Sequence, residues 1–213
     1  KELEAALEFP WEKWTIFLHP EQQSWVDRQF NGPARVSGSA GTGKTIVALH
    51  RAVALAKENP DSRVLLATFS TALAGALSVK LRRLIGSNPR LGERIDVFSL
   101  DSLGLRLHKA TLGQVSLATP EQIGHAIERA AAEVGDHKFS QSFLRQEWEQ
   151  VIDAWQLTSW EEYRDVARLG RKTRLPQARR EVLWRIFDCV RSNLVAEGLS
   201  TQAGVFSRLA ASI

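Results

Sequence analysis

The stretch "RVSGSAGTGKTIVALHRA", residues 35–52, decides the fold of this chain. Its apolar lead predicts a short buried strand over residues 33–38. A glycine-rich loop follows, and an apolar pattern with helical spacing then runs from Lys44 to Asn59, where Pro60 closes it. A strand, a glycine-rich loop and a helix in this order are typical of an open α/β sheet.

The loop matches the pattern G-x-x-x-x-G-K-[ST] at every position. The matching residues are Gly38, Ser39, Ala40, Gly41, Thr42, Gly43, Lys44 and Thr45. Glycines let backbone N–H groups approach phosphates, and the helix that begins near Lys44 adds its positive dipole end. We expect Lys44 to bridge the β- and γ-phosphates and the Thr45 hydroxyl to coordinate magnesium. A glycine-rich turn without a ligand is the alternative, and the complete match weighs against it.

Strands and helices alternate after the loop. Strands are expected at 62–69 and 94–99, and helices at 71–86 and 100–109. This spacing implies parallel β-α-β units joined by right-handed crossovers.

From residue 111 the chain is expected to be helical, apart from a short strand at 113–118. The helices are expected at 119–134, 140–155, 159–170, 176–198 and 200–213, with N-caps at Thr119, Ser140, Ser159 and Ser200. Before the loop, a short helix at 1–8 is stopped by Pro10, an aromatic segment follows, and a further helix is expected at 20–30. The predicted architecture is an α/β layer followed by an all-helical second half.

Composition narrows the function classes. No apolar run approaches the roughly 20 residues of a membrane span and no secretory signal leads the chain, so we expect a soluble intracellular protein. The formal charge of +4 permits a polyanionic partner without requiring one. Cys189 is the single cysteine, which excludes a disulfide framework, and its helical run predicts a buried small side chain. The five histidines lack ligand spacing, so a metal cluster is not expected.

Two segments beside the loop narrow the choice of ligand. Upstream, "FLHPEQQSWV" contains Gln22 and Gln23, and glutamine can bond adenine through N6 and N7. Taken alone, the two glutamines are better explained as solvated helix positions. Downstream, Thr68, Phe69, Ser70 and Thr71 follow a strand, where open parallel sheets bind ligands. Hydroxyls there contact phosphates and an aromatic ring stacks a base, although Phe69 alone is better explained as a core residue.

Together these segments resemble superfamily I helicases of the UvrD/Rep type. "LHPEQQ" resembles the adenine-reading motif of that family, "GSAGTGKT" its phosphate loop, and "TFSTALA" and "VFSLDSLGLRL" its next two motifs. The likeness covers about residues 15–108. It implies a P-loop NTPase with a RecA-like parallel sheet, formed in part by residues 1–110, and a helical insertion over residues 111–213.

The resemblance also implies an ATP- and magnesium-dependent motor on single-stranded or partly duplex DNA, usually moving 3′ to 5′. It assigns Lys44 and Thr45 to ATP and magnesium and Gln22 to adenine. The implied nucleic-acid-binding residues are Thr68, Phe69, Ser70, Thr71, Ser99 and Asp101.

The chain departs from the family pattern at several positions. Ala72 stands where lysine is commoner, and Asp101 where histidine often stands. Ile46 replaces an arginine that packs near the base, for which Arg51 is the candidate substitute. The sequence contains no Asp-Glu-x-Gln motif to activate water and no second RecA-like domain. We therefore expect a helicase fragment that does not sustain ATP turnover alone and that works with the remainder of a helicase chain.

The helical half raises two further possibilities. A basic cluster consists of Arg168, Arg171, Lys172, Arg174, Arg179, Arg180 and Arg185. It can track a phosphate backbone or form a solvated helix face, and the sequence does not separate the two. The four tryptophans of this half, Trp148, Trp155, Trp160 and Trp184, are predicted to be core residues rather than base-stacking platforms.

Two rival functions use the same loop. One is a nucleic-acid-associated motor that displaces protein without separating strands. The other is a P-loop kinase or signalling ATPase without a nucleic-acid partner.

Overall fold

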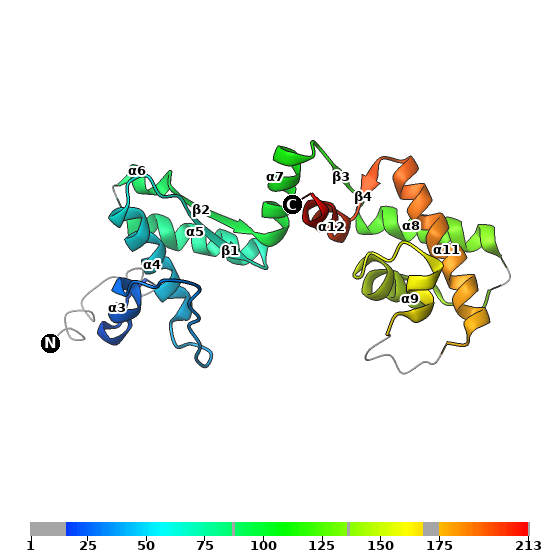
Figure 1. Ribbon diagram of the computed structural model, residues 1–213, viewed down its shortest axis with the longest axis horizontal. Helices are drawn as coiled ribbons and strands as arrows, with labels where there is room; N and C mark the ends of the chain where they lie inside the picture. The colour runs from blue at the N-terminus through cyan, green and yellow to red at the C-terminus, as the bar shows by residue number, and fades with distance from the viewer. Residues whose placement is uncertain (1–15, 87, 136, 168–174, 213) are drawn as a thin grey trace. The chain divides into compact units, whose positions relative to one another are not determined.

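The computed structural model describes residues 16–86, 88–135, 137–167 and 175–212. The chain divides into two compact units, Lys1–Leu103 and Gly104–Ile213 (Figure 1). Helix α7 (Leu100–Thr111) crosses the division. The helix and aromatic segment expected before residue 16 lie outside the described residues.

The first unit is built on a parallel strand pair. Its elements before α7 are α3 (Pro20–Asp27), α4 (Lys44–Glu58), β1 (Val64–Thr68), α5 (Thr71–Ile85), α6 (Pro89–Gly92) and β2 (Ile95–Ser99). Strands β1 and β2 pair in parallel from Val64 opposite Ile95 to Thr68 opposite Ser99. Since α5 connects them, the β-α-β unit expected from the sequence is confirmed (Figure 1).

Helix α4 supplies one side of the core of this unit. It buries Leu49, Ala52, Val53 and Ala56, which follow the i, i+3, i+4, i+7 spacing of one helix face. This face packs with buried leucines of α5 and with Ile95 of β2. Each fully buried aliphatic side chain contributes roughly 1.5–3 kcal/mol to folding, so the core holds the end of the glycine-rich loop, where α4 begins, against the strand pair.

The strand expected over residues 33–38 is not formed. These residues have no regular structure and all are exposed, including Val36 at 42%. A strand is stabilised by a hydrogen-bonded neighbour, and within the described residues β1 and β2 pair with each other and no strand lies beside 33–38. The prediction was wrong because a short apolar lead cannot form a ladder without a partner.

The second unit is mainly helical. After α7 it contains β3 (Ser116–Leu117), α8 (Pro120–Val134), α9 (Gln141–Glu147), the π-helical turn η1 (Trp148–Asp153), α10 (Trp160–Asp165), α11 (Gln177–Ala196), β4 (Leu199–Ser200) and α12 (Gln202–Ala211). Helices α8 and α11 pack together (Figure 1), burying Ile127 and Ala130 of α8 with Ile186 and Phe187 of α11. The expected helices are therefore present, although α10 is shorter than predicted.

The second unit differs from the prediction in three details. The helix expected over 140–155 changes to a π-helical turn at Trp148 and ends before Gln156. Strand β4 was not expected, and it pairs in parallel with β3. Ser200 lies in this strand, so Thr201 caps α12 in its place by accepting a hydrogen bond from the Gly204 N–H.

The other three expected caps are confirmed. Each hydroxyl accepts a hydrogen bond from a backbone N–H in the first helical turn: Thr119 from Gln122, Ser140 from Phe143 and Ser159 from Glu162. None of the helices in the described part of the chain combines the length and the apolar character that crossing a bilayer requires.

The tryptophan predictions are confirmed with one exception, and Cys189 is less buried than predicted. Trp148 is buried, and Trp160 and Trp184 are half-buried against the same core. Trp155, however, is 64% exposed, because it lies in the turn that follows η1. Cys189 is half-buried, and burial together with a hydrogen bond to Glu133 raises the pKa of its thiol, which favours the unreactive protonated form.

Candidate functional site

The glycine-rich loop turns into α4 through two left-handed residues. Gly41 has φ 79° and Gly43 has φ 78°, values that only glycine adopts readily. Gly43 is the N-cap of α4 and has no side chain to satisfy the free N–H groups of the first turn. These N–H groups and the positive end of the helix dipole are therefore available to an anion.

The lysine of the loop is folded back onto the loop itself. The Lys44 ammonium donates hydrogen bonds to the carbonyl oxygens of Gly38, at 2.9 Å, and Ser39, at 2.6 Å. The Thr42 hydroxyl also donates to the Ser39 carbonyl, at 2.9 Å. Thr45 is exposed in the first turn of α4. The loop thus holds its own cation in place, beside the free N–H groups of α4.

Gln22 connects α3 to this loop. Its Oε1 accepts a hydrogen bond from the His19 N–H at 3.1 Å, and its Nε2 donates to the Thr42 carbonyl at 2.9 Å. A Cβ at Gly43 would lie 2.6 Å from the Nε2 of Gln22, so this contact requires glycine at Gly43. Gln23 turns away instead and donates to the Asp27 carboxylate. The structure therefore brings Gln22 to the phosphate loop and does not bring Gln23 there.

His19 is a site residue that the sequence analysis did not single out. It is the N-cap of α3, where its Nδ1 accepts a hydrogen bond from the Glu21 N–H. Gln22 reaches back to the His19 N–H and completes a capping box, with Pro20 in the first helical turn. A capping residue, proline and then glutamine two residues on is a readable start signal, and here it also orients Gln22 toward the loop.

Arg51, the expected substitute for a base-side arginine, is half-buried between α4 and α3. Its guanidinium donates to the Val26 carbonyl and lies 5.3 Å from the centre of the Phe30 ring. It also lines a cavity of about 370 Å³ together with Asp27 and Glu58. These contacts hold α3 on α4, and the nucleotide role of Arg51 stays a prediction.

The expected nucleic-acid residues gather at the carboxyl ends of the two strands. Thr68 and Ser99 end β1 and β2 and are register partners. Ser99 is buried, and its hydroxyl oxygen accepts from the Ser102 N–H at 3.2 Å and lies 3.4 Å from the Thr71 hydroxyl. Ser70 caps α5 by accepting a hydrogen bond from the Leu73 N–H. These hydroxyls therefore already shape the sheet edge.

Phe69 does not pack in the core. It is 88% exposed directly after β1, so the interpretation of this ring as a core residue was wrong. Asp101 is exposed in the first turn of α7, which follows β2. An apolar ring exposed to this degree beside hydroxyls forms a surface that a flat, partly apolar ligand can cover.

The basic cluster is described only in part. Arg179 and Arg185 are exposed on α11, whereas Arg180 is half-buried and donates to the Arg164 carbonyl. Arg168, Arg171, Lys172 and Arg174 lie outside the described residues. Both interpretations of this cluster therefore remain open.

A glycine-rich loop with a lysine at the start of the following helix is the pattern of P-loop proteins. The sequence matches the model of the UvrD/REP helicase N-terminal domain over residues 18–188, and the chain belongs to that family. This confirms the resemblance found in the motifs, and the family implies a helicase that uses a nucleotide and binds nucleic acid. A comparison with curated proteins gives no match.

Proposed function

We propose that this chain is the ATP-binding N-terminal portion of an ATP-dependent DNA helicase or translocase that moves 3′ to 5′. Residues 1–110 would contribute the first part of a RecA-like domain, and residues 111–213 a helical insertion. The observation that carries the proposal is the hydrogen bond from Gln22 to the Thr42 carbonyl, because it joins the candidate base-reading residue to the phosphate loop.

The unused hydrogen-bond donor and acceptor of the Gln22 amide fit adenine. An amide group has two N–H donors and two acceptor lone pairs, and the contacts with Thr42 and His19 use one of each. The remaining acceptor suits the adenine N6 amino group and the remaining donor suits N7. Guanine presents a carbonyl oxygen in place of the N6 amino group, so the same amide would discriminate between the two bases.

The phosphates would occupy the loop and the start of α4. Backbone N–H groups and Lys44 would hold the β- and γ-phosphates, and the Thr45 hydroxyl would contact magnesium. Thr45 supplies a single hydroxyl oxygen, and Mg²⁺ in phosphate sites takes its other ligands from phosphate and water. The donor set therefore fits an ATP–magnesium complex rather than the free ion, and bound magnesium would neutralise charge on the phosphates.

Single-stranded DNA would bind at the carboxyl ends of β1 and β2. The exposed Phe69 ring offers a stacking surface for a base, worth roughly 1–3 kcal/mol. Thr68, Ser70 and Thr71 would contact phosphates and sugar, and Asp101 would accept hydrogen bonds from base amino groups. Ser99 is buried, so it would act by holding the Thr71 hydroxyl rather than by touching the strand. These residues follow β1 and β2, and α4 packs on the same two β-strands. The nucleotide and the single-stranded DNA would therefore bind to one structural unit.

The nucleotide part of the proposal is tested by ATP binding to the Lys44→Ala variant, with Lys57→Ala as the matched control. Lys57 is exposed in the last turn of the same helix. We expect Lys44→Ala to lose about tenfold or more in ATP affinity, since a charge-assisted contact contributes ~1.5–3 kcal/mol. Lys57→Ala should bind as the parent does. Equal affinities of both variants, measured by calorimetry, would contradict the assignment of the loop to ATP.

A further inference from the structure

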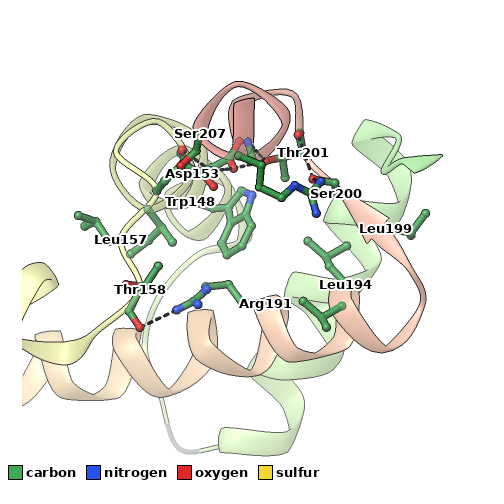
Figure 2. A pocket seen from close by; sticks show the side chains of 15 residues that line it. Trp148, Asp153, Leu157, Thr158, Arg191, Leu194, Leu199, Ser200, Thr201 and Ser207 are labelled. Carbon is green, nitrogen blue, oxygen red and sulfur yellow. Dashed lines mark hydrogen bonds between the residues drawn. The ribbon is translucent and has the colours of Figure 1, made fainter. Parts of the chain in front are cut away.

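The second unit contains a pocket that none of the family motifs uses (Figure 2). Its volume is about 310 Å³, and its lining comes from η1, the turn after it, α11, β4 and α12. At ~30 Å³ per water this is room for roughly ten water molecules, comparable with the number of non-hydrogen atoms in one nucleobase. In Figure 2 the indole of Trp148 stands between Asp153 and Thr201 on one side and Arg191 and Leu194 on the other.

Trp148 lines this pocket, and its buried indole carries an unused hydrogen-bond donor. Its side chain is 2% exposed, and its indole N–H has no partner among the described residues. Buried indole N–H groups normally find an acceptor, because leaving one unpaired is unfavourable. An acceptor atom on a ligand in the pocket would satisfy it.

The backbone around the pocket has two rare conformations. Trp148 to Asp153 form a π-helical turn, a form that is frequent at functional sites. Gln156 has φ 47°, the one non-glycine residue in the described part of the chain with a positive φ. Its amide donates to the Asp153 carboxylate at 2.7 Å, which holds this conformation and directs both side chains to the lining.

The polar lining favours an anion with an apolar body. Arg208 donates to the Ser200 hydroxyl at 2.6 Å, and no carboxylate in the described residues forms an ion pair with it. Arg191 donates to the Thr158 carbonyl at 2.9 Å, lies 3.8 Å from the Asp188 carboxylate, and retains further donors. The Asp153 carboxylate opposes them, but the Thr201 hydroxyl and the Gln156 amide already engage it. Leu157, Leu194 and Leu199 form apolar walls.

We propose that this pocket receives one unstacked nucleotide of a single strand, with the base between the leucine walls and an acceptor of the base on the Trp148 N–H. The phosphate would lie at Arg208 on the rim. The choice of a nucleotide over an acidic peptide rests on the proposed function, since the chain belongs to a helicase family. Trp155, exposed in the turn that lines the pocket, offers the neighbouring base a stacking surface.

The test follows the indole N–H resonances of the whole chain labelled with ¹⁵N-tryptophan. Trp148→Phe identifies the Trp148 signal among those of the seven tryptophans, and the other signals report on folding. The probes are thymidine 5′-monophosphate, a short oligothymidylate and an oligoglutamate peptide. Ser207→Leu places a larger side chain in the lining from an exposed position on α12. Ser192→Leu is its control, exposed on α11 and not part of the lining.

We expect both nucleotide probes to shift the Trp148 signal downfield in the parent and in Ser192→Leu, and not in Ser207→Leu. Trp148→Phe lacks this signal, so calorimetry measures its affinity for the monophosphate, which should be about three- to tenfold weaker, as expected for one lost hydrogen bond. An unmoved Trp148 signal at saturating monophosphate would overturn the proposal. So would a shift that Ser207→Leu leaves intact, or one that oligoglutamate alone produces.

Fluorescence anisotropy of a labelled oligothymidylate measures overall strand binding separately. If the parent chain binds no oligothymidylate, the proposed DNA role of the first unit is contradicted. The monophosphate titration would still decide whether the pocket accepts a nucleotide, so the two failures are distinguishable.

Discussion

Gln22 and Gln23 are neighbours with the same side chain and opposite surroundings. Gln22 bonds the phosphate loop, and Gln23 bonds Asp27 on its own helix. The helical pattern alone could not separate them, because both positions fit a solvated helix, and only the resemblance to the helicase motif pointed to Gln22. The capping box at His19 makes the difference, since it turns the Gln22 amide toward the loop. The position of a side chain relative to a cap thus decides its role.

This contrast predicts the behaviour of two alanine variants. We expect Gln22→Ala to lower ATP affinity about tenfold, since two hydrogen bonds at ~0.5–1.5 kcal/mol each are lost, and to abolish preference for ATP over GTP. Gln23→Ala should retain both affinity and preference. Competition of ATP and GTP against a fluorescent nucleotide measures the two quantities, and a preference that survives in Gln22→Ala would refute the adenine contact.

Asp153 predicts a pH effect on stability. Burial raises the pKa of its carboxyl above the ordinary value of 3.8, although hydrogen bonds from Thr201 and Gln156 act in the opposite direction. The charged form is thus less favourable in the folded state. Asp153→Asn keeps an acceptor for both partners and removes the charge. We expect it to increase the free energy of unfolding near neutral pH by less than about 1 kcal/mol, because solvent screens a partly exposed group.

The direction of the Asp153 pKa shift determines the pH range in which its charge lowers stability. The destabilisation by the charged carboxylate is present in full above the raised folded pKa, declines as the pH falls through it, and is absent below 3.8. The advantage of Asp153→Asn should therefore disappear in acid. Urea unfolding at several pH values measures it, with Glu181→Gln, an exposed change on α11, as control. An advantage that grows toward acid would contradict the assignment.

For two glycines within helices, we expect substitution by alanine to change the free energy of unfolding in opposite directions. Gly75 is exposed on α5 and a Cβ there meets no atom within 4 Å, whereas a Cβ at Gly104 on α7 would lie 2.7 Å from the Phe206 ring. We expect Gly75→Ala to increase the free energy of unfolding by ~0.5–1 kcal/mol. Gly104→Ala should decrease it by ~1–3 kcal/mol through overpacking. Denaturant titration measures both, and equal responses would contradict this contact.

Phe69, exposed directly after β1, is the residue for which we predict a contact with DNA. Phe69→Ala should weaken binding of single-stranded DNA about tenfold, because one stacked base contributes ~1–3 kcal/mol. Val79→Ala removes another exposed apolar side chain, from α5, and should leave affinity unchanged. Anisotropy titrations at fixed salt compare the two. Equal losses would show that general apolar exposure, rather than stacking at the strand end, governs binding.

Elements with a clear periodic pattern of their own could be predicted, including β1 and β2, whereas features that a distant contact alone supports could not. The amphipathic pattern of α8 with Thr119 and Pro120 before it contains its own start and its buried face. The segment 33–38 lacks such local support, since a strand exists only beside another strand. Where α9 turns into η1, Trp148 packs against Phe187 of α11, a distant contact that no local pattern contains.

The residues of the candidate site likewise differ in whether the sequence could identify them. Lys44, Thr45 and the glycines of the loop could be proposed from spacing alone, because a loop of this pattern would bind phosphate with its own backbone. The exposure of Phe69 could not be predicted, since an apolar ring after a strand is compatible with core or surface. The pocket at Trp148 was also beyond the sequence, because five separate segments supply its walls.

For the whole molecule, we predict binding of ATP without sustained turnover by the 213-residue chain. Lys44 and Thr45 would hold phosphates and magnesium, and the proposed site assigns neither of them to activate the attacking water. Phosphate release should stay at the level of the Lys44→Ala variant, with or without single-stranded DNA. Steady release stimulated by DNA would refute this expectation.

The contact of Lys44 with its own loop has a consequence for how the nucleotide arrives. A free lysine side chain loses up to about 2 kcal/mol of rotamer entropy when it is ordered. Here the Gly38 and Ser39 carbonyls have already ordered it. An incoming triphosphate would exchange two carbonyl partners for phosphate oxygens instead of capturing a mobile chain. The lysine of the loop is thus preorganised, and affinity would depend on how much better phosphate holds the ammonium than two peptide oxygens do.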